Sequence, residues 1–111
     1  MEMILLYDYY GALLTQRQRE CFELRYHQDL SLGEIADELG ISRQGVYDNL
    51  IRTEAQLRHM EEKTGCVRRD MACRKAVRDI LNLAAQLEAA EDKHISDLAR
   101  QIIVVAQSVE E

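Results

Sequence analysis

The chain has 111 residues, of which 47% are hydrophobic and 31% charged, and its formal net charge is -6 at pH 7. This length fits one small domain, or a small domain with a helical extension. The apolar runs are too short for a signal peptide or a membrane span, so we expect a cytoplasmic protein without membrane insertion. The 3 Cys fit reduced thiols better than a disulfide framework.

The composition predicts an all-α fold, because the chain has no Pro, only 5 Gly, and many strong helix formers. A first helix is predicted over residues 3–14, with an apolar face made of Ile4, Leu5, Tyr9, Ala12 and Leu13. A second helix is predicted to begin after Thr15 and to end near residue 28. There "TQRQ" has the spacing of a capping box, and the inner face is Cys21, Phe22, the Arg25 stem and Tyr26.

Residues 31–52, "SLGEIADELGISRQGVYDNLIR", have the pattern of a helix-turn-helix. Ser31 and Glu34 form a second capping-box pattern, and Gly40 is placed to end that short helix in a left-handed conformation. Ser42 is then the expected cap of a helix that runs to about residue 63. Its inward row is Val46, Leu50, Thr53, Leu57 and Met60. Residues 1–63 therefore form the expected helix-turn-helix unit.

Residues 64–111 are predicted to be a helical extension that serves packing or dimerisation. Two amphipathic helices are expected, over about 67–90 and about 96–109. Their apolar stripes require a partner surface, which could be the first helix, the 42–63 helix, or a second subunit. A homodimer is the expected assembly. The stripes are Val77, Ile80, Leu81, Ala84 and Leu87 on the former, and Ile95, Leu98, Ala99, Ile102, Val105, Ala106 and Val109 on the latter.

In a helix-turn-helix, the first residues of the second helix face the bases or the phosphates of DNA. A helical rotation of 100° per residue turns Gln44, Tyr47, Asp48 and Ile51 away from the inward row, with Arg43 and Arg52 beside them. Gln44 could pair with adenine, and Arg43 could reach guanine or phosphate. Asp48 and Ile51 suit a nucleic acid less well, and Tyr47 with Ile51 could instead contact a protein. Nucleic acid, protein and plain solvent all stay open as neighbours of this face.

The segment "ALLTQRQRECFELRYHQDLSLGEIADELGISRQGVYDNLIRTE" resembles the YlxM family of small bacterial proteins and, more distantly, region 4 of bacterial sigma factors. The resemblance covers residues 6–63. It implies a DNA-binding protein of winged-helix-like or sigma-region-4-like class. A regulatory role in the signal recognition particle pathway is also implied, because the family's genes tend to lie beside those of the targeting GTPase and its receptor. The residues that match the family's recognition helix are Ser42, Arg43, Gln44, Tyr47, Asp48, Asn49 and Arg52.

The chain departs from that family pattern at two positions. Gly45 stands where the family usually has Ala, and Ile51 stands where a Lys is usual. The missing Lys removes one expected phosphate contact. Residues 1–63 also hold 12 Asp and Glu against 7 Lys and Arg, an excess of acid that opposes non-specific attraction to phosphates. A partner protein, such as the targeting GTPase or its receptor, is therefore the alternative hypothesis.

Other kinds of site are not predicted. The chain has no C-x-x-C or H-x-x-x-H pair, so neither a metal nor another cofactor is expected. His27 with Asp29, and His94 with Asp92, lack any nucleophile motif or phosphate loop beside them, and we expect no enzyme. A basic cluster on the 67–90 helix is either a solvated face or a contact to a nucleic-acid backbone. It consists of Arg68, Arg69, Arg74, Lys75 and Arg78.

Overall fold

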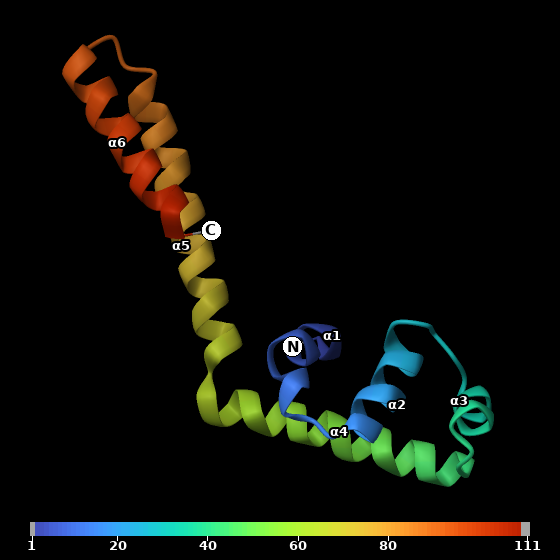
Figure 1. The fold of residues 1–111 in the computed structure, drawn as a ribbon. Helices are drawn as coiled ribbons and strands as arrows, with labels where there is room; N and C mark the ends of the chain where they lie inside the picture. Colours follow the sequence, from blue (N-terminus) through green and yellow to red (C-terminus); the bar gives the residue numbers. More distant parts are fainter. Residues whose placement is uncertain (1, 110–111) are drawn as a thin grey trace. The chain divides into compact units, whose positions relative to one another are not determined.

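The computed structural model describes residues 2–109, and every regular element within that range is a helix (Figure 1). The elements are α1 (Met3–Tyr10), the 3₁₀ turn η1 (Gly11–Leu13), α2 (Gln16–Tyr26), α3 (Leu32–Leu39), α4 (Arg43–Thr64), α5 (Cys66–Glu88) and α6 (Lys93–Val109). The prediction of an all-α fold is confirmed. The chain divides into two compact units, Met1–Val67 and Arg68–Glu111.

The helix starts lie where the capping patterns predicted them. The side chains of Thr15 and Ser31 each accept a hydrogen bond from the backbone N–H three residues on, at Gln18 and Glu34. The side chains of Gln18 and Glu34 in turn accept from the backbone N–H groups of Thr15 and Ser31. The backbone N–H of Ser31 donates to Glu34 and lowers the pKa of its carboxyl. Gly40 ends α3 with φ 69°, in the left-handed region that favours glycine. The Ser31 box and Gly40 thus define the start and the end of α3.

The core of the Met1–Val67 unit is organised along α4. Helices α1, α2 and α3 follow one another beside it in Figure 1, and all three contact it. One cluster surrounds Phe22, whose ring stacks between Tyr7 and Tyr26 at centroid distances of 4.3 Å each. A second cluster joins Cys21, Ile35 and the start of α4. The predicted inward row is confirmed, with its first four members fully covered and Met60 half-buried: Val46, Leu50, Thr53, Leu57 and Met60.

Tyrosine–glutamate hydrogen bonds tie the helices of this unit together at the edge of the core. Tyr7 donates to Glu23 and Tyr10 donates to Glu61, each at 2.6 Å, and Tyr26 donates to Glu54. These bonds join α1 to α2, α1 to α4, and α2 to α4. Hydrogen bonds to a charged partner are stronger than neutral ones. The phenols therefore bury their rings and still keep a polar partner.

The predicted first helix is wrong in its length and in its buried face. The α-helix stops at Tyr10, because the chain tightens into a 3₁₀ turn at Gly11, whose backbone lies against the ring of Tyr7. Tyr9, Ala12 and Leu13 are exposed instead of buried, whereas Ile4 and Leu5 of the predicted face are half-buried. The Arg25 side chain is also exposed, and it donates to the Leu30 carbonyl. The buried residues of the first segment are Leu6, Tyr7, Tyr10 and Leu14.

The Arg68–Glu111 unit contains the long part of α5 and all of α6, which lie side by side as an antiparallel hairpin (Figure 1). Asp92 caps α6 by accepting from the backbone N–H of His94 at 2.8 Å and of Ile95 at 3.2 Å. Within the hairpin the buried residues are mostly small. They are Val77, Ala84, Ser96, Ala99 and Ala106. Most large members of the two predicted stripes are exposed, because the helices meet through these smaller side chains.

A pair of leucines in the first segment tests the corrected position of the core. Leu6 is 1% exposed and Leu13 is 71% exposed. Replacing Leu6 with Ala leaves a cavity, and we expect a loss of about 2–5 kcal/mol in the free energy of unfolding. Leu13→Ala removes the same atoms from the surface and should change it by less than about 0.5 kcal/mol. Urea unfolding followed by circular dichroism measures both, and equal losses would contradict the structure.

The tyrosines of the core predict a stability loss at high pH. Burial, followed by the hydrogen bond to a glutamate, raises the pKa of Tyr7 and of Tyr26 from 10.0 to about 12. A raised pKa in the folded state contributes stability that is complete below the unfolded value and is lost as pH rises through the folded value. The free energy of unfolding should therefore fall between about pH 10 and pH 12. Tyr26→Phe should flatten this fall, whereas an unchanged slope in that variant would count against the assignment.

Candidate nucleic-acid interface

The second helix of the helix-turn-helix begins at a well-formed cap. Ser42 has extended backbone angles, and its Oγ accepts from the N–H of Gly45 at 2.9 Å. A Cβ placed on Gly45 would lie 3.1 Å from that Oγ, so glycine leaves this cap uncrowded. The buried row of α4 holds the helix from its inner side. The opposite side of its first turns faces solvent, where a helix N-terminus favours negative charge such as phosphate.

Most of the residues predicted to contact a nucleic acid are exposed, and Gln44, Tyr47 and Asp48 lie on this outer side. The exception is Asn49, which is half-buried and accepts from Thr53 Oγ1 at 3.4 Å. Asn49 therefore supports the inner packing of α4 more than it serves the surface. A contact between any of these side chains and a nucleic acid stays a prediction. The exposed members are Ser42, Arg43, Gln44, Tyr47, Asp48 and Arg52.

Arg43 lies across the start of α3. A Cβ placed on Gly33 would come within 3.0 Å of Nε and of Nη2 of Arg43, so the guanidinium occupies the space that a side chain at position 33 would need. Gly33 was not among the predicted site residues. One signal for it was present in the sequence, because a glycine inside a short helix costs stability and asks for a local reason. The exposed guanidinium of Arg43, a residue of α4, thus lies against α3.

Gln44 and Asp48 are bonded to each other one turn apart. Gln44 Nε2 donates to Asp48 Oδ1 at 2.9 Å, and both side chains are exposed. The bond uses one of the two N–H donors of the Gln44 amide and restrains the orientation in which the amide could meet a base. The bond also turns the carboxylate of Asp48 toward a donor within the protein. Gln44, whose amide could pair with adenine, and Asp48, whose carboxylate would repel phosphate, therefore form one hydrogen-bonded pair.

Tyr47 and Ile51 form a small apolar patch on the same side of α4. Each is 49% exposed, and they are four residues apart, which makes them neighbours along the helix. A tyrosine ring could stack on a base or pack against a protein, whereas an isoleucine serves the second purpose better. The patch adjoins the Gln44–Asp48 pair.

A further arginine from α2 approaches the turn, and sequence patterns did not single it out. Arg17 Nη1 donates to the Leu39 carbonyl at 3.5 Å, near the end of α3, and Arg17 Nε lies 3.9 Å from Glu20. It is a surface cation that is partly balanced by an acid one turn away. Its placement depends on how α2 packs against α3, which no local motif records.

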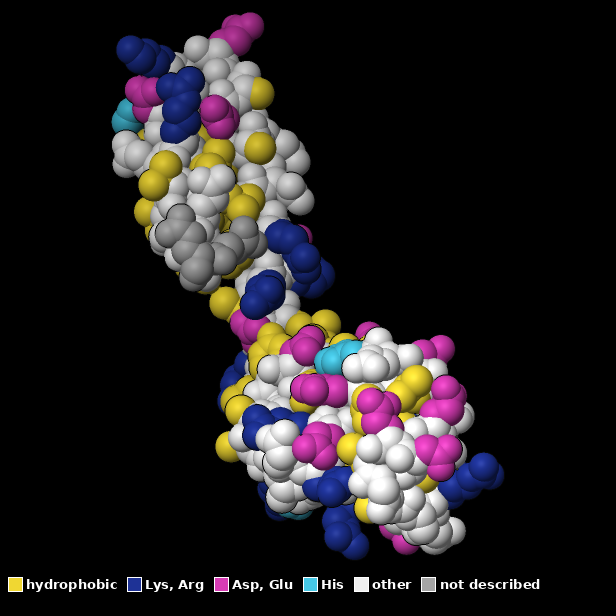
Figure 2. All heavy atoms as spheres, turned by 45° about the vertical axis from the view of Figure 1, so that its right-hand side comes forward, with side chains coloured by type: hydrophobic (Ala, Val, Ile, Leu, Met, Phe, Trp, Pro, Cys, Tyr) yellow, Lys and Arg dark blue, Asp and Glu magenta, His cyan; other side chains and the backbone are white. Residues whose placement is uncertain are grey.

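The charge around the motif is mixed. Figure 2 shows acidic side chains spread over one face of the unit that carries α1 to α4, with Lys and Arg side chains set apart from one another. Because residues 1–63 hold 12 Asp and Glu against 7 Lys and Arg, we expect a low affinity for arbitrary sequences.

Within residues 2–109, no three or more His, Cys, Asp or Glu side chains are grouped so that they could hold a metal ion. Cys21 is buried, and burial raises the pKa of its thiol, whereas Cys66 and Cys73 are exposed; within residues 2–109 none of the three is in a disulfide. Among the same residues, none of the helices has the length and apolar character needed to span a membrane.

Comparisons with known proteins agree with this geometry. Residues 1–100 match the model of the family described as "Putative helix-turn-helix protein, YlxM / p13 like". A UPF0122 protein of Thermoanaerobacter sp. (strain X514) is 63% identical over 67 residues, which is 60% of this chain and 57% of that protein. The chain thus spans little more than half the length of that relative.

Two further relatives extend the match along the chain. A UPF0122 protein of Caldanaerobacter subterraneus subsp. tengcongensis is 55% identical over 78 residues, covering 70% of this chain and 67% of that protein. A UPF0122 protein of Bacillus cereus (strain AH187) is 38% identical over 105 residues, covering 95% and 91% respectively. The family model and these relatives together include the helix-turn-helix and most of the residues after it. The chain therefore belongs to the YlxM/p13-like family of helix-turn-helix proteins, UPF0122.

Proposed function

We propose that this protein is a regulatory nucleic-acid-binding protein that places the first turns of α4 in a groove of DNA or structured RNA. The observation that carries the proposal is the exposed side of α4 just after the Ser42 cap, opposite the fully buried row of the same helix. In this docking mode the first turns of the second helix meet base edges. Arg43 and Gln44 supply base contacts, and Arg52 a phosphate contact.

The proposed pathway is protein targeting by the signal recognition particle. The support is the resemblance of residues 6–63 to the YlxM family, whose genes tend to lie beside those of the targeting GTPase and its receptor. The protein would act in the cytoplasm, as a binding module and not as an enzyme. Two copies are proposed to act together, joined through residues 64–111, because the exposed apolar side chains of α5 and α6 require a cover.

The second candidate function is that of an adaptor on the targeting GTPase or its receptor. It is favoured by one observation, the Tyr47–Ile51 patch, in which Ile51 takes the place of a Lys that the family usually has. An apolar contact of this kind is only weakly sensitive to salt, whereas phosphate contacts weaken steeply with it. The two functions therefore differ in a measurable property.

Arginine substitutions on α4 test nucleic-acid binding. We expect Arg43→Ala to weaken binding of the preferred sequence by about 1–3 kcal/mol through the lost base contact. Arg52→Ala should weaken all sequences alike and reduce the slope of log K against log salt by about 1. Arg58→Ala is the matched control, because Arg58 is an exposed arginine of the same helix beyond its first turns. Fluorescence anisotropy over a salt series, with DNA and RNA selected from random pools, measures all three.

The Tyr47–Ile51 patch separates the two functions. Ile51→Glu should abolish capture of the targeting GTPase or its receptor in a nuclease-treated extract if the adaptor function holds. In the same extract, Arg43→Ala should leave that capture unchanged. If neither substitution alters binding to any nucleic acid or to either targeting protein, both proposed functions are wrong.

A further inference from the structure

Helix α6 carries two parallel rows of side chains, and the hairpin uses only one of them. The row that faces α5 is small or partly covered and consists of Ser96, Ala99, Ile103 and Ala106. The neighbouring row is large, aliphatic and exposed. Its spacing of 3, 4, 3 and 4 residues is that of a coiled-coil contact surface. Its members are Ile95, Leu98, Ile102, Val105 and Val109, with exposed fractions from 41% to 68%.

Helix α5 repeats this arrangement. Val77 and Ala84 are buried against α6, while Ile80, Leu83 and Leu87 stay 44%, 61% and 48% exposed. These three residues also follow a spacing of 3 and 4. Each helix of the hairpin thus has a second apolar row, as a helix has when it belongs to a four-helix bundle and contacts two neighbours.

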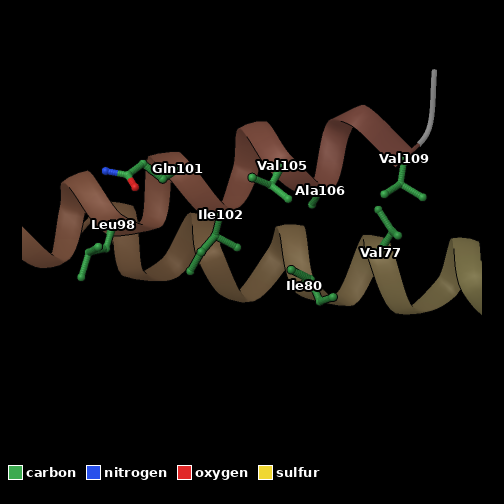
Figure 3. A pocket seen from close by; sticks show the side chains of 8 residues that line it. All are labelled: Val77, Ile80, Leu98, Gln101, Ile102, Val105, Ala106 and Val109. Carbon is green, nitrogen blue, oxygen red and sulfur yellow. The ribbon is translucent and has the colours of Figure 1, made fainter.

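Ile80 of the exposed α5 row and most of the exposed α6 row line one groove of about 530 Å³ between the two helices. Val77 and Ile80 line it from α5, and Leu98, Ile102 and Val105 line it from α6 (Figure 3). Gln101 is the one polar side chain among the eight that line this groove. An apolar groove of this size between two helices is shaped to receive apolar side chains from further helices.

We propose that the groove is covered by the same hairpin of a second copy of the chain, forming an antiparallel four-helix bundle whose two-fold axis runs perpendicular to the helices. The proposal rests on the pairing of two copies put forward under the proposed function, and it specifies the surface and the direction. A two-fold interface must be complementary to itself. An aliphatic groove rimmed by aliphatic rows meets that requirement.

The charges along the hairpin favour a second copy of the chain as the partner, and they favour antiparallel over parallel pairing of the two hairpins. Residues 68–79 hold five Lys and Arg against two Asp, whereas residues 88–97, at the loop end, hold four Asp and Glu against one Lys. Antiparallel pairing places the acidic loop end of each copy beside the basic segment of the other. The alternative, with both loops at the same end, would bring like charges together, which is unfavourable.

The polar side chain in the groove, Gln101, lies at the middle of α6, where a two-fold axis could cross the helix. Gln101 is the central residue of α6, which spans Lys93–Val109. If the two-fold axis crosses the middle of α6, Gln101 of one chain meets Gln101 of the other. An amide carries both donors and an acceptor, so two Gln101 side chains can bond to each other. A single polar pair in an apolar contact also fixes the register.

Adjacent valines provide a matched test of the surface. Val105 lines the groove and Val104 does not, yet their exposed fractions are 68% and 67%. The full chain at about 50 µM should have twice the mass of the 12.9 kDa monomer in light scattering. Val105→Glu should raise the dissociation constant at least about 100-fold by placing a charge in an apolar contact. Val104→Glu should leave the mass doubled.

Cysteine cross-linking tests the direction. In a Cys66→Ser, Cys73→Ser background, Gln101→Cys should form a disulfide-linked dimer on mild oxidation, and Glu91→Cys at the loop should not. A monomeric wild-type chain, or equal effects of the two valine variants, overturns the groove as the interface. Cross-linking through position 91 instead of 101 overturns the antiparallel direction. These outcomes do not depend on the fluorescence anisotropy measurements, so the dimer and nucleic-acid binding are tested separately.

Discussion

The packing of three short helices against one side of α4 is the constraint on which the Met1–Val67 unit depends. Val46, Leu50 and Leu57 are 0–5% exposed, and together with Thr53 they commit one side of the helix to the core. The rotation of the helix then fixes which residues point outward. Arg43, Gln44 and Tyr47 are exposed because their neighbours are buried, and not because any of them requires solvent. The candidate interface thus follows from the core packing of α4, and a change in that packing would rotate other side chains of the helix into the solvent-facing position.

The sequence predicted the helix-turn-helix well because its determinants are local. A cap at Ser31 or Ser42 and a left-handed glycine at position 40 act within one turn of the chain, so their spacing alone identifies them. The first helix was predicted less well. Its apolar and aromatic residues are nearly continuous, and periodicity could not choose a face. The choice came from the stacking of Tyr7 on Phe22, a contact between α1 and α2 that has no local signature.

The candidate site shows the same division between local and tertiary information. Exposure of Arg43, Gln44 and Tyr47 followed from helical rotation. The resting position of Arg43 over Gly33, the bond from Gln44 to Asp48, and the approach of Arg17 to the turn depend on side-chain conformations and on tertiary packing. The bond between Gln44 and Asp48 gives the acidic residue a role that composition alone could not suggest. It restrains the orientation of the amide that is proposed to read a base, and it uses only one of the two N–H donors of that amide.

The small residues inside the α5–α6 hairpin have a consequence for how folding depends on the amount of protein. Ala84, Ala99 and Ala106 let the helices approach closely, but they remove little apolar surface from water. Because so little apolar area is buried between α5 and α6, the hairpin would gain most of its stability from a partner that covers its exposed apolar side chains. If that cover is another copy of the chain, the melting temperature of this unit rises with protein concentration by mass action, while that of the Met1–Val67 unit does not. The cell's supply of the protein would then set how much of this hairpin is folded.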